Sequence, residues 1–171
     1  MQGVTLETER FRLRTLTEDD ATARYLSWLD DGDSRRNILY ARQRRSLDDL
    51  RGYIAIRRES VDAAFFGIFD RATGAHIGNL KYEPIDRTAG WTVMGILIGE
   101  PSWRGKGVTP EVLEASGRWL KDTFGIKEIL LGVLKGNAAA VRAYEKAGFR
   151  PDETGRLPVD PEGLAMARVL A

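Results

Sequence analysis

Residues 91–98 read WTVMGILI, an apolar run without a single charge. A strand with one wet face alternates polar and apolar side chains, whereas an unbroken apolar run is typical of a strand covered on both faces. We therefore predict that residues 91–98 form a central strand of a sheet with helices on both sides. Such a strand favours a layered α/β fold.

Hydrophobic periodicity and turn residues predict the other elements. Strands are expected at residues 10–16, 64–69, 76–82, 129–134, from Phe149 onward and at 166–170. Helices are expected from Thr17 to about Leu29, from Ser46 onward, and over residues 110–124 and 137–147. The 171 residues fit one domain with a buried core, so we predict a single mixed α/β (α+β) domain over residues 1–171.

Composition excludes several classes of function. The chain has no cysteine and a single histidine, His76, so we expect no disulfide, no thiolate nucleophile and no metal site. A net charge of +1 gives no field that would attract nucleic acid. Residues 1–10 lack the apolar core of a signal peptide, and no apolar run approaches the roughly 20 residues that span a bilayer. We therefore expect a cytoplasmic protein with no membrane or nucleic-acid partner.

A glycine-lined stretch, SWRGKGVTPEVLEA, follows the central strand and precedes a predicted helix. The N–H groups at a helix start lack internal partners and lie at the positive end of the helix dipole. Gly105 and Gly107 let the backbone approach an anion closely, while Arg104 and Lys106 add positive charge. Thr109 is predicted as the N-cap of the helix and Pro110 as its first residue. This pattern predicts a phosphate-binding loop, with a ligand-free connection as the alternative.

Two familiar nucleotide motifs do not fit this stretch. A P-loop needs five residues from its first glycine to its second and then Lys-Ser or Lys-Thr, but Gly99 is six residues before Gly105 and Lys106 precedes Gly107. A dinucleotide fingerprint would need a third glycine at Pro110. The phosphate is therefore expected to belong to another kind of ligand.

A second motif, GNAAAVRAYEKAGFR, begins about thirty residues later. Asn137 is predicted to cap a helix that carries Tyr144 and ends at Gly148 in the left-handed conformation. Together with WRGKGVTPEVLEA, this motif resembles the GNAT superfamily of N-acetyltransferases, whose acyl-CoA signature is Arg/Gln-x-x-Gly-x-Gly/Ala. The chain has Arg104 and Gly107 at the first two places and departs from the signature with Thr109 at the last. The N-terminal half resembles the RimJ/RimL-like branch, which acetylates ribosomal protein N-termini and small amines.

The resemblance implies a fold and a cofactor. The fold would be a mixed, mostly antiparallel central sheet of about six to seven strands, with helices on both faces and a splayed central parallel pair. Acetyl-CoA would bind in the splay. The cofactor-binding residues would be Ile98, Gly99, Arg104, Gly105, Lys106, Gly107, Val108, Thr109, Asn137 and Tyr144, with residues 104–109 around the pyrophosphate.

The resemblance also implies a direct attack of an amine on the thioester in a ternary complex. Tyr144 matches the family's proposed general acid toward sulfur. Glu100 is our preferred base, with Glu83 and Asp86 as alternatives. His76 is expected to be a structural, hydrogen-bonded histidine rather than a base.

The acceptor stays open at this level, as a small-molecule amine or a protein N-terminus. The segments expected to shape its site are residues 35–45, which hold five arginines, and residues 83–90 and 151–165. The arginines favour an acidic acceptor over a polycation, although residues 35–45 could equally be a solvated connection. The alternative function is a non-catalytic acyl-CoA sensor on the same fold. Edge strands could pair to form a homodimer.

Overall fold

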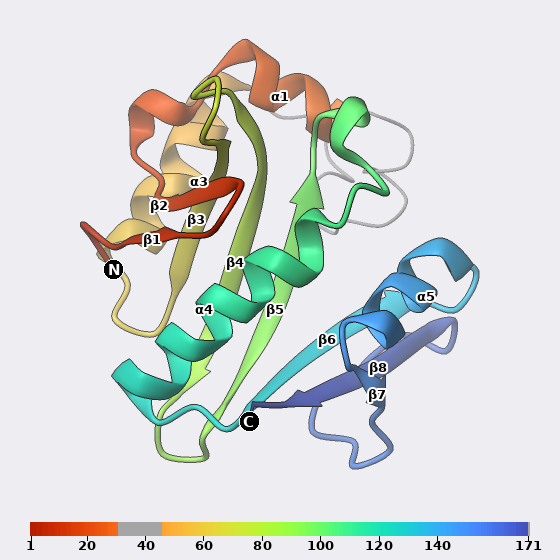
Figure 1. Cartoon of the computed structure of the whole chain (residues 1–171). Coiled ribbons are helices and arrows are strands. Elements are labelled where there is room, and N and C mark those ends of the chain that lie inside the picture. The colour runs from red at the N-terminus through yellow and green to blue at the C-terminus, as the bar shows by residue number, and fades with distance from the viewer. Residues whose placement is uncertain (31–45, 171) are drawn as a thin grey trace.

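The computed structural model describes residues 1–30 and 46–170 (Figure 1). The predicted role of residues 35–45 therefore falls outside the described residues. The strands are β1 Thr5–Glu7, β2 Phe11–Thr15, β3 Ala64–Asp70, β4 His76–Asp86, β5 Trp91–Ile98, β6 Glu128–Leu134, β7 Arg150–Pro151 and β8 Gly163–Val169. The α-helices are α1 Ala23–Asp30, α3 Leu47–Glu59, α4 Val108–Phe124 and α5 Ala138–Lys146, with 3-10 turns at Glu18–Asp20 and Pro101–Trp103. No described helix combines the length and apolar character needed to cross a bilayer.

The strands form one sheet in the order β1-β2-β3-β4-β5-β6-β8-β7. Every neighbouring pair is antiparallel except β5–β6, which is parallel. This arrangement confirms the predicted mixed, mostly antiparallel sheet with the strand at 91–98 near its centre. The described sheet has eight strands instead of six to seven, because the edge strand β1 has three residues and is too short to show a periodic pattern.

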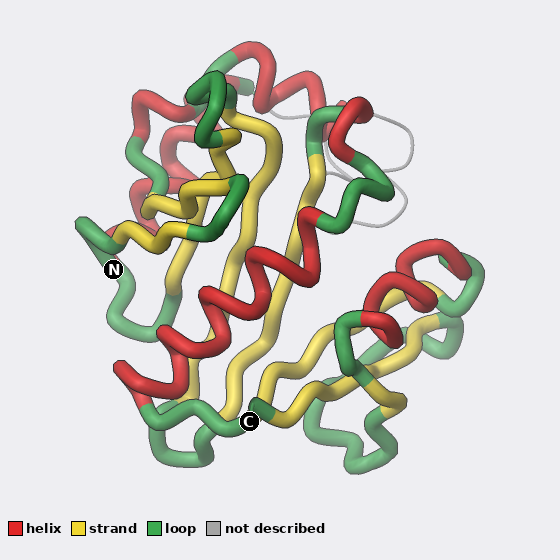
Figure 2. The backbone as a smooth tube through the Cα atoms, viewed as in Figure 1, coloured by secondary structure: helices red, strands yellow, loops and turns green. Residues whose placement is uncertain are grey.

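The parallel pair holds together at one end only. β5 and β6 pair from Trp91 with Glu128 to Val93 with Leu130. Beyond that point β5 keeps pairing with β4 as far as Ile98, and β6 keeps pairing with β8 as far as Leu134. The two strands therefore diverge, as Figure 2 shows, and the predicted splay is confirmed.

Helices pack on both faces of the sheet. Phe65 and Phe66 are neighbours on β3 and point to opposite faces, because successive side chains of a strand alternate. Phe65 lies in a buried cluster with side chains of α1 and α3, including Leu29 and Leu50. Phe66 lies in the larger cluster under α4, where its ring meets Trp119 edge to face at 5.3 Å. Both faces of the central strands are thus covered, as the apolar run predicts.

The predicted helix after Thr17 is interrupted. The Asp20 carboxylate accepts two hydrogen bonds from the Arg14 guanidinium, both at 2.7 Å, and one from the Thr17 N–H at 2.8 Å. These bonds tie a short 3-10 turn to β2, and α1 begins afresh at Ala23. Thr22 Oγ1 accepts from the Tyr25 N–H at 3.1 Å, so Thr22 supplies the side-chain oxygen at the start of α1.

Candidate active site

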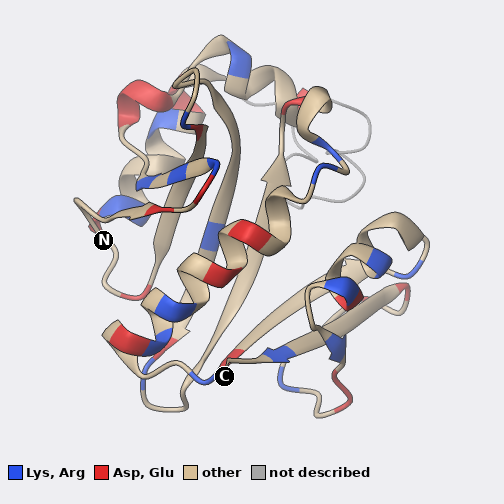
Figure 3. Ribbon diagram, viewed as in Figure 1, with Lys and Arg blue, Asp and Glu red and all other residues tan. Residues whose placement is uncertain are grey.

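A glycine-lined loop connects the end of β5 to α4 and carries the basic residues drawn in blue there in Figure 3. Gly105 and Gly107 both have a φ of +73°, in the left-handed region that disfavours side chains. Gly107 is the N-cap of α4, and Val108 is its first residue. The prediction that Thr109 is the N-cap is wrong, because the left-handed turn at Gly107 already directs the chain into the helix.

Part of the loop closes on itself. The Arg104 N–H donates to the Pro101 carbonyl at 3.2 Å, and the Lys106 N–H donates to the Trp103 carbonyl at 3.4 Å. These two N–H groups complete the turn that leads from β5 into the loop.

The other N–H groups of the loop are available to a ligand. Within residues 1–30 and 46–170, the N–H groups of Gly105 and Gly107 have no acceptor. Those of Val108 and Thr109 belong to the first turn of α4, where the helix itself provides no acceptor. Four donors thus gather at the positive end of a helix dipole, an arrangement that fits a diphosphate.

Arg10 holds this loop from its carbonyl side. Its guanidinium donates to the carbonyls of Lys106 at 3.0 Å and Gly107 at 3.2 Å. The C=O and N–H of a trans peptide point in opposite directions. The contacts of Arg10 therefore turn the N–H groups of Gly107 and Val108 away from β2, toward the ligand side.

Glu111 on α4 fixes Arg10 in turn. Its carboxylate accepts from the Arg10 Nε at 2.7 Å and from the Arg10 N–H at 2.8 Å. Burial opposes ionisation of Glu111, but the hydrogen bonds from Thr8 and Arg10 outweigh it and lower the pKa of Glu111. Sequence reasoning missed this pair, because Arg10 is 96 residues from Lys106 and no local pattern joins them.

The edge of β5 that faces the divergence is a second binding surface. The Gly99 N–H donates to the Ile77 carbonyl at 3.0 Å. In an antiparallel pair, residues alternate between facing the partner strand and facing away from it. The register of Leu97 with Asn79 therefore makes Gly99 and Leu97 face β4, while the N–H groups of Ile96 and Ile98 face the divergence. Gly99 is thus engaged with β4, and of the two predicted donors only Ile98 points toward the cofactor side.

Arg104 lies against the end of the same strand. Its Nε donates to the Ile98 carbonyl at 3.1 Å and its Nη2 to the Gly99 carbonyl at 3.3 Å. The guanidinium therefore fastens the loop to β5, in addition to bringing positive charge to the loop.

Asn137 caps α5 as predicted. Its Oδ1 accepts from the Ala140 N–H at 3.2 Å, and Gly148 follows the helix with a φ of +89°. Tyr144 on this helix packs its ring on Phe149 at 5.8 Å between centroids. Burial raises the pKa of Tyr144 to about 12, and its hydroxyl has no hydrogen-bond partner among the described residues. The phenol is therefore protonated at neutral pH and available as a donor.

Glu100 follows β5 and faces α1. Its Oε1 accepts from the Arg24 Nε at 2.6 Å and from the Trp28 Nε1 at 3.0 Å. The hydrogen bond from Arg24 is the main cause that lowers the pKa of Glu100, and a lowered pKa weakens a carboxylate as a base. The structure does not bring Glu100 together with Tyr144, and it gives Glu100 a role in holding α1.

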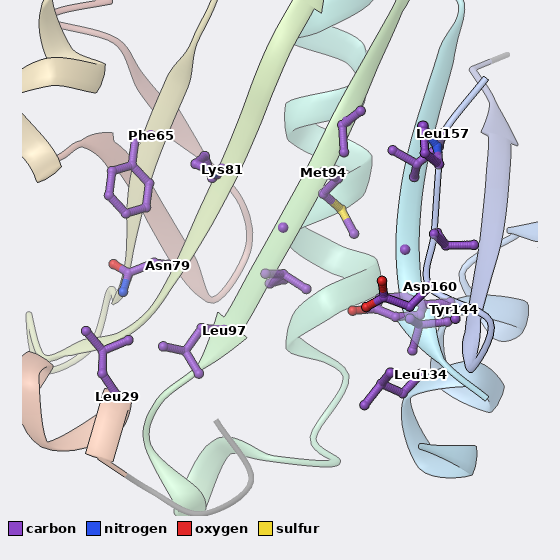
Figure 4. A pocket seen from close by; sticks show the side chains of 18 of the residues that line it. Leu29, Phe65, Asn79, Lys81, Met94, Leu97, Leu134, Tyr144, Leu157 and Asp160 are labelled. Carbon is purple, nitrogen blue, oxygen red and sulfur yellow. The ribbon is translucent and has the colours of Figure 1, made fainter. Parts of the chain in front are cut away.

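A cavity of about 600 Å³ lies beside β5 (Figure 4). β5 forms its floor with residues 93–97, and Tyr144 reaches it from α5. One wall comes from α1, α3, β3 and β4, where Asn79 and Lys81 supply the polar groups. The opposite wall comes from residues 157–160, and there Asp160 points toward the cavity beside Tyr144.

The cavity identifies residues that sequence reasoning missed. Asn79 lies inside an apolar strand and Asp160 inside a turn-rich tail, so neither carries a local signal of function. The prediction that residues 151–165 shape the site agrees with the lining by residues 157–160. No residue of 83–90 is among the described residues that line the cavity, so Glu83 and Asp86 lie outside it.

The geometry fits an acyl-CoA: four free donors face a diphosphate position, and a free strand edge runs from them to a cavity with a buried phenol. In agreement with this, residues 10–150 match the family model of the acetyltransferase (GNAT) domain. The chain belongs to this family of acetyltransferases, which take the acetyl group from acetyl-CoA.

Solved structures share the fold at low sequence identity. The RimL ribosomal alpha-N-protein acetyltransferase in complex with coenzyme A superposes with a TM-score of 0.82 at 13% identity, over 98% of each chain. A chimera of the Vibrio cholerae spermidine N-acetyltransferase SpeG and hSSAT gives a TM-score of 0.77 at 18% identity, over 95% of this chain and 96% of that one. The microcin C7 self-immunity acetyltransferase MccE, with acetyl-CoA and AMP, gives 0.78 at 12% identity, over 94% and 93%. A search of curated protein sequences returned no match.

Proposed function

We propose that the protein transfers the acetyl group of acetyl-CoA directly to a primary amine that enters the cavity beside β5. The observation that carries this proposal is the divergence of β5 and β6 between the four free N–H donors of the loop and the buried Tyr144. Acetyl-CoA supplies the thioester whose carbonyl the amine attacks. The residues of the chain must then hold the cofactor, orient the carbonyl and move two protons.

The roles follow from the geometry. The N–H groups of Gly105, Gly107, Val108 and Thr109 bind the diphosphate, and Arg104 and Lys106 add charge. The outward N–H groups of Ile96 and Ile98 bind the pantetheine arm and the carbonyl oxygen. Tyr144 donates its phenolic proton toward the sulfur, because burial keeps that proton in place at neutral pH. Asn137 contributes through α5, which it caps.

The amine must lose a proton before it attacks, since an alkylammonium has a pKa near 10. Glu100 is held by Arg24 and Trp28, so it can serve this step only through a bridging water. Asp160 is a carboxylate that lines the cavity, and we assign to it the attraction of the acceptor's ammonium group.

The acceptor classes come from the similar structures and from the cavity. The names of those proteins include a spermidine N-acetyltransferase and an N-terminal protein acetyltransferase, which agrees with a small-molecule amine or a protein N-terminus. A cytoplasmic location, a homodimer and the absence of nucleic-acid and membrane partners stay predictions from the sequence.

Two measurements test the proposal. Acetyl-CoA at about 100 times its Kd should stabilise the fold by roughly 2.7 kcal/mol, seen as an increase of Tm of about 5–10 °C, whereas ATP should leave the Tm unchanged. Free-thiol release should then appear when primary amines are added to the saturated protein. Stabilisation without thiol release for any amine would favour the non-catalytic acyl-CoA sensor, and no stabilisation would contradict the cofactor assignment itself.

A further inference from the structure

Asn79 places an unused hydrogen-bond donor at the cavity. Its side chain is buried, with 4% exposed, and it lines the wall formed by β4 (Figure 4). Its Nδ2 has no hydrogen-bond partner in the described part of the chain. A buried polar group without a partner costs free energy, so such a group calls for a ligand or a function.

The neighbouring His76 determines which atom of the amide is unused. The His76 Nε2 lies 2.9 Å from Asn79 Oδ1 and 3.0 Å from the Gly78 carbonyl. A carbonyl oxygen can only accept, so Nε2 carries a proton and the Asn79 atom beside it must be the oxygen. The free atom is therefore the N–H₂ donor, and its ligand must contain a hydrogen-bond acceptor.

Lys81 places an excess of positive charge on the same wall. Its Nζ donates to the Tyr53 hydroxyl at 3.0 Å and to Glu83 Oε2 at 2.9 Å. The Arg57 Nε donates to that same Glu83 oxygen at 3.0 Å. Two cations thus share one carboxylate, which leaves a net charge of +1 for these three side chains and disfavours a polycation beside them.

Gly95 leaves the floor open directly beside these groups. It is the cross-strand partner of Lys81, as Leu97 is of Asn79, so all four residues face the same side of the sheet. A Cβ built at Gly95 would have no heavy atom within 4 Å. The far wall carries the opposite charge, because Asp160 lines it. The cavity therefore has a donor-rich wall and an acidic wall on either side of a bare patch of β5.

We propose, on the basis of the proposed function, that Asn79 and Lys81 form an acceptor subsite for a carbonyl or carboxylate group, so that the acceptor is an aminoacyl compound and not a polyamine. The oxygen of the acceptor accepts from Asn79 Nδ2 and faces the Lys81 charge, and its amine lies toward Asp160 and Tyr144. The free α-amine of an amino-acid amide or of a peptide has both groups one carbon apart. Spermidine has only cationic and apolar groups, so it leaves Asn79 Nδ2 without a partner.

The test uses a matched pair of acceptors with the saturated wild-type protein. Alaninamide and 1,2-diaminopropane differ in that a carbonyl replaces a methylene group, and spermidine and dipeptide amides extend the comparison. We expect kcat/KM for the aminoacyl probes, from thiol release, to exceed that for the two polyamines by about tenfold or more, as for one lost hydrogen bond. Calorimetric Kd values with the CoA-bound protein should show the same order.

Two variants locate the preference. Asn79→Asp keeps the oxygen that His76 needs but replaces the donor with a second acceptor, and it should abolish the preference for alaninamide over 1,2-diaminopropane. Gly95→Leu should fill the floor and raise the KM of the acceptor about tenfold while the KM of acetyl-CoA stays unchanged. The control Gly52→Leu adds the same side chain on α3, where a Cβ also meets nothing within 4 Å, and should change neither value.

The outcomes separate this inference from the proposed function. Thiol release that favours the diamine or spermidine would overturn the subsite while leaving the acetyltransferase activity intact. An unchanged preference in Asn79→Asp together with an unchanged acceptor KM in Gly95→Leu would also overturn it. If neither class of probe gives thiol release, failure of every aminoacyl probe to bind the CoA complex in calorimetry overturns it by binding alone.

Discussion

Gly107→Trp should lower the affinity for acetyl-CoA about a hundredfold in a protein that still folds. Gly107 has a φ of +73° and caps α4, and a Cβ there would meet only Arg10 Nη2, at 3.6 Å. A large side chain therefore finds room within the protein but occupies the space in front of the free N–H groups. Losing one to two charge-assisted hydrogen bonds, at about 1.5–3 kcal/mol each, corresponds to about this loss of affinity. Isothermal titration calorimetry with acetyl-CoA measures it.

The control for this change is Gly74→Trp. Gly74 has the same φ of +73°, lies in the turn between β3 and β4, and offers equal space for a Cβ. Both variants carry the same conformational cost of a side chain in the left-handed region, about 1–2 kcal/mol. We expect Gly74→Trp to match the lowered Tm of Gly107→Trp and to keep the wild-type Kd. Equal Kd values for the two variants would contradict the assignment of the loop.

Tyr144→Phe should lower kcat by about a hundredfold or more, in the range of a lost general acid, and leave the Kd of acetyl-CoA nearly unchanged. The hydroxyl has no partner among the described residues, and the ring packs on Phe149, so removing one oxygen preserves the packing. Burial raises the pKa of Tyr144 to about 12, so the wild-type phenol stays protonated throughout the neutral range. Steady-state thiol release, together with calorimetry, separates turnover from binding.

Tyr82→Phe is the matched control, because it removes a buried phenol on the other face of the sheet. The Tyr82 hydroxyl bonds Ser116 Oγ at 2.8 Å under α4, outside the cavity, and Ser116 keeps its bond to the Val112 carbonyl at 2.7 Å. We expect a loss of about 1 kcal/mol in stability, as for one hydrogen bond, with normal turnover. If Tyr144→Phe keeps a kcat within about twofold of Tyr82→Phe, Tyr144 is not the acid.

The framework of the fold could be predicted because its signals are local. The apolar run at residues 91–98 indicates the central strand, and the capping oxygens of Ser46 and Asn137 mark two helices that the structure confirms. The left-handed glycines Gly105 and Gly107 are also local, since only the backbone of that loop requires them. The splay and the acyl-CoA were predicted from the resemblance to the GNAT superfamily, which the match to residues 10–150 supports.

The parts that could not be predicted depend on contacts between distant segments. Arg10 reaches the carbonyls of Lys106 and Gly107 only because β2 lies beside the start of α4. Asn79 is one polar residue in an apolar strand, and its free Nδ2 follows from the position of His76. Glu100 was selected as a base from its place after β5, but Arg24 and Trp28 on α1 occupy its carboxylate. No periodic pattern in the sequence encodes these pairings.

A crystal structure of the protein with coenzyme A tests the central claim most directly. We predict diphosphate oxygens at hydrogen-bond distance, about 3 Å, from the backbone nitrogens of Gly105, Gly107, Val108 and Thr109, with Arg10 still bonded to the loop carbonyls on the other side. Coenzyme A bound with its diphosphate elsewhere, and those four N–H groups facing only solvent, would contradict the account.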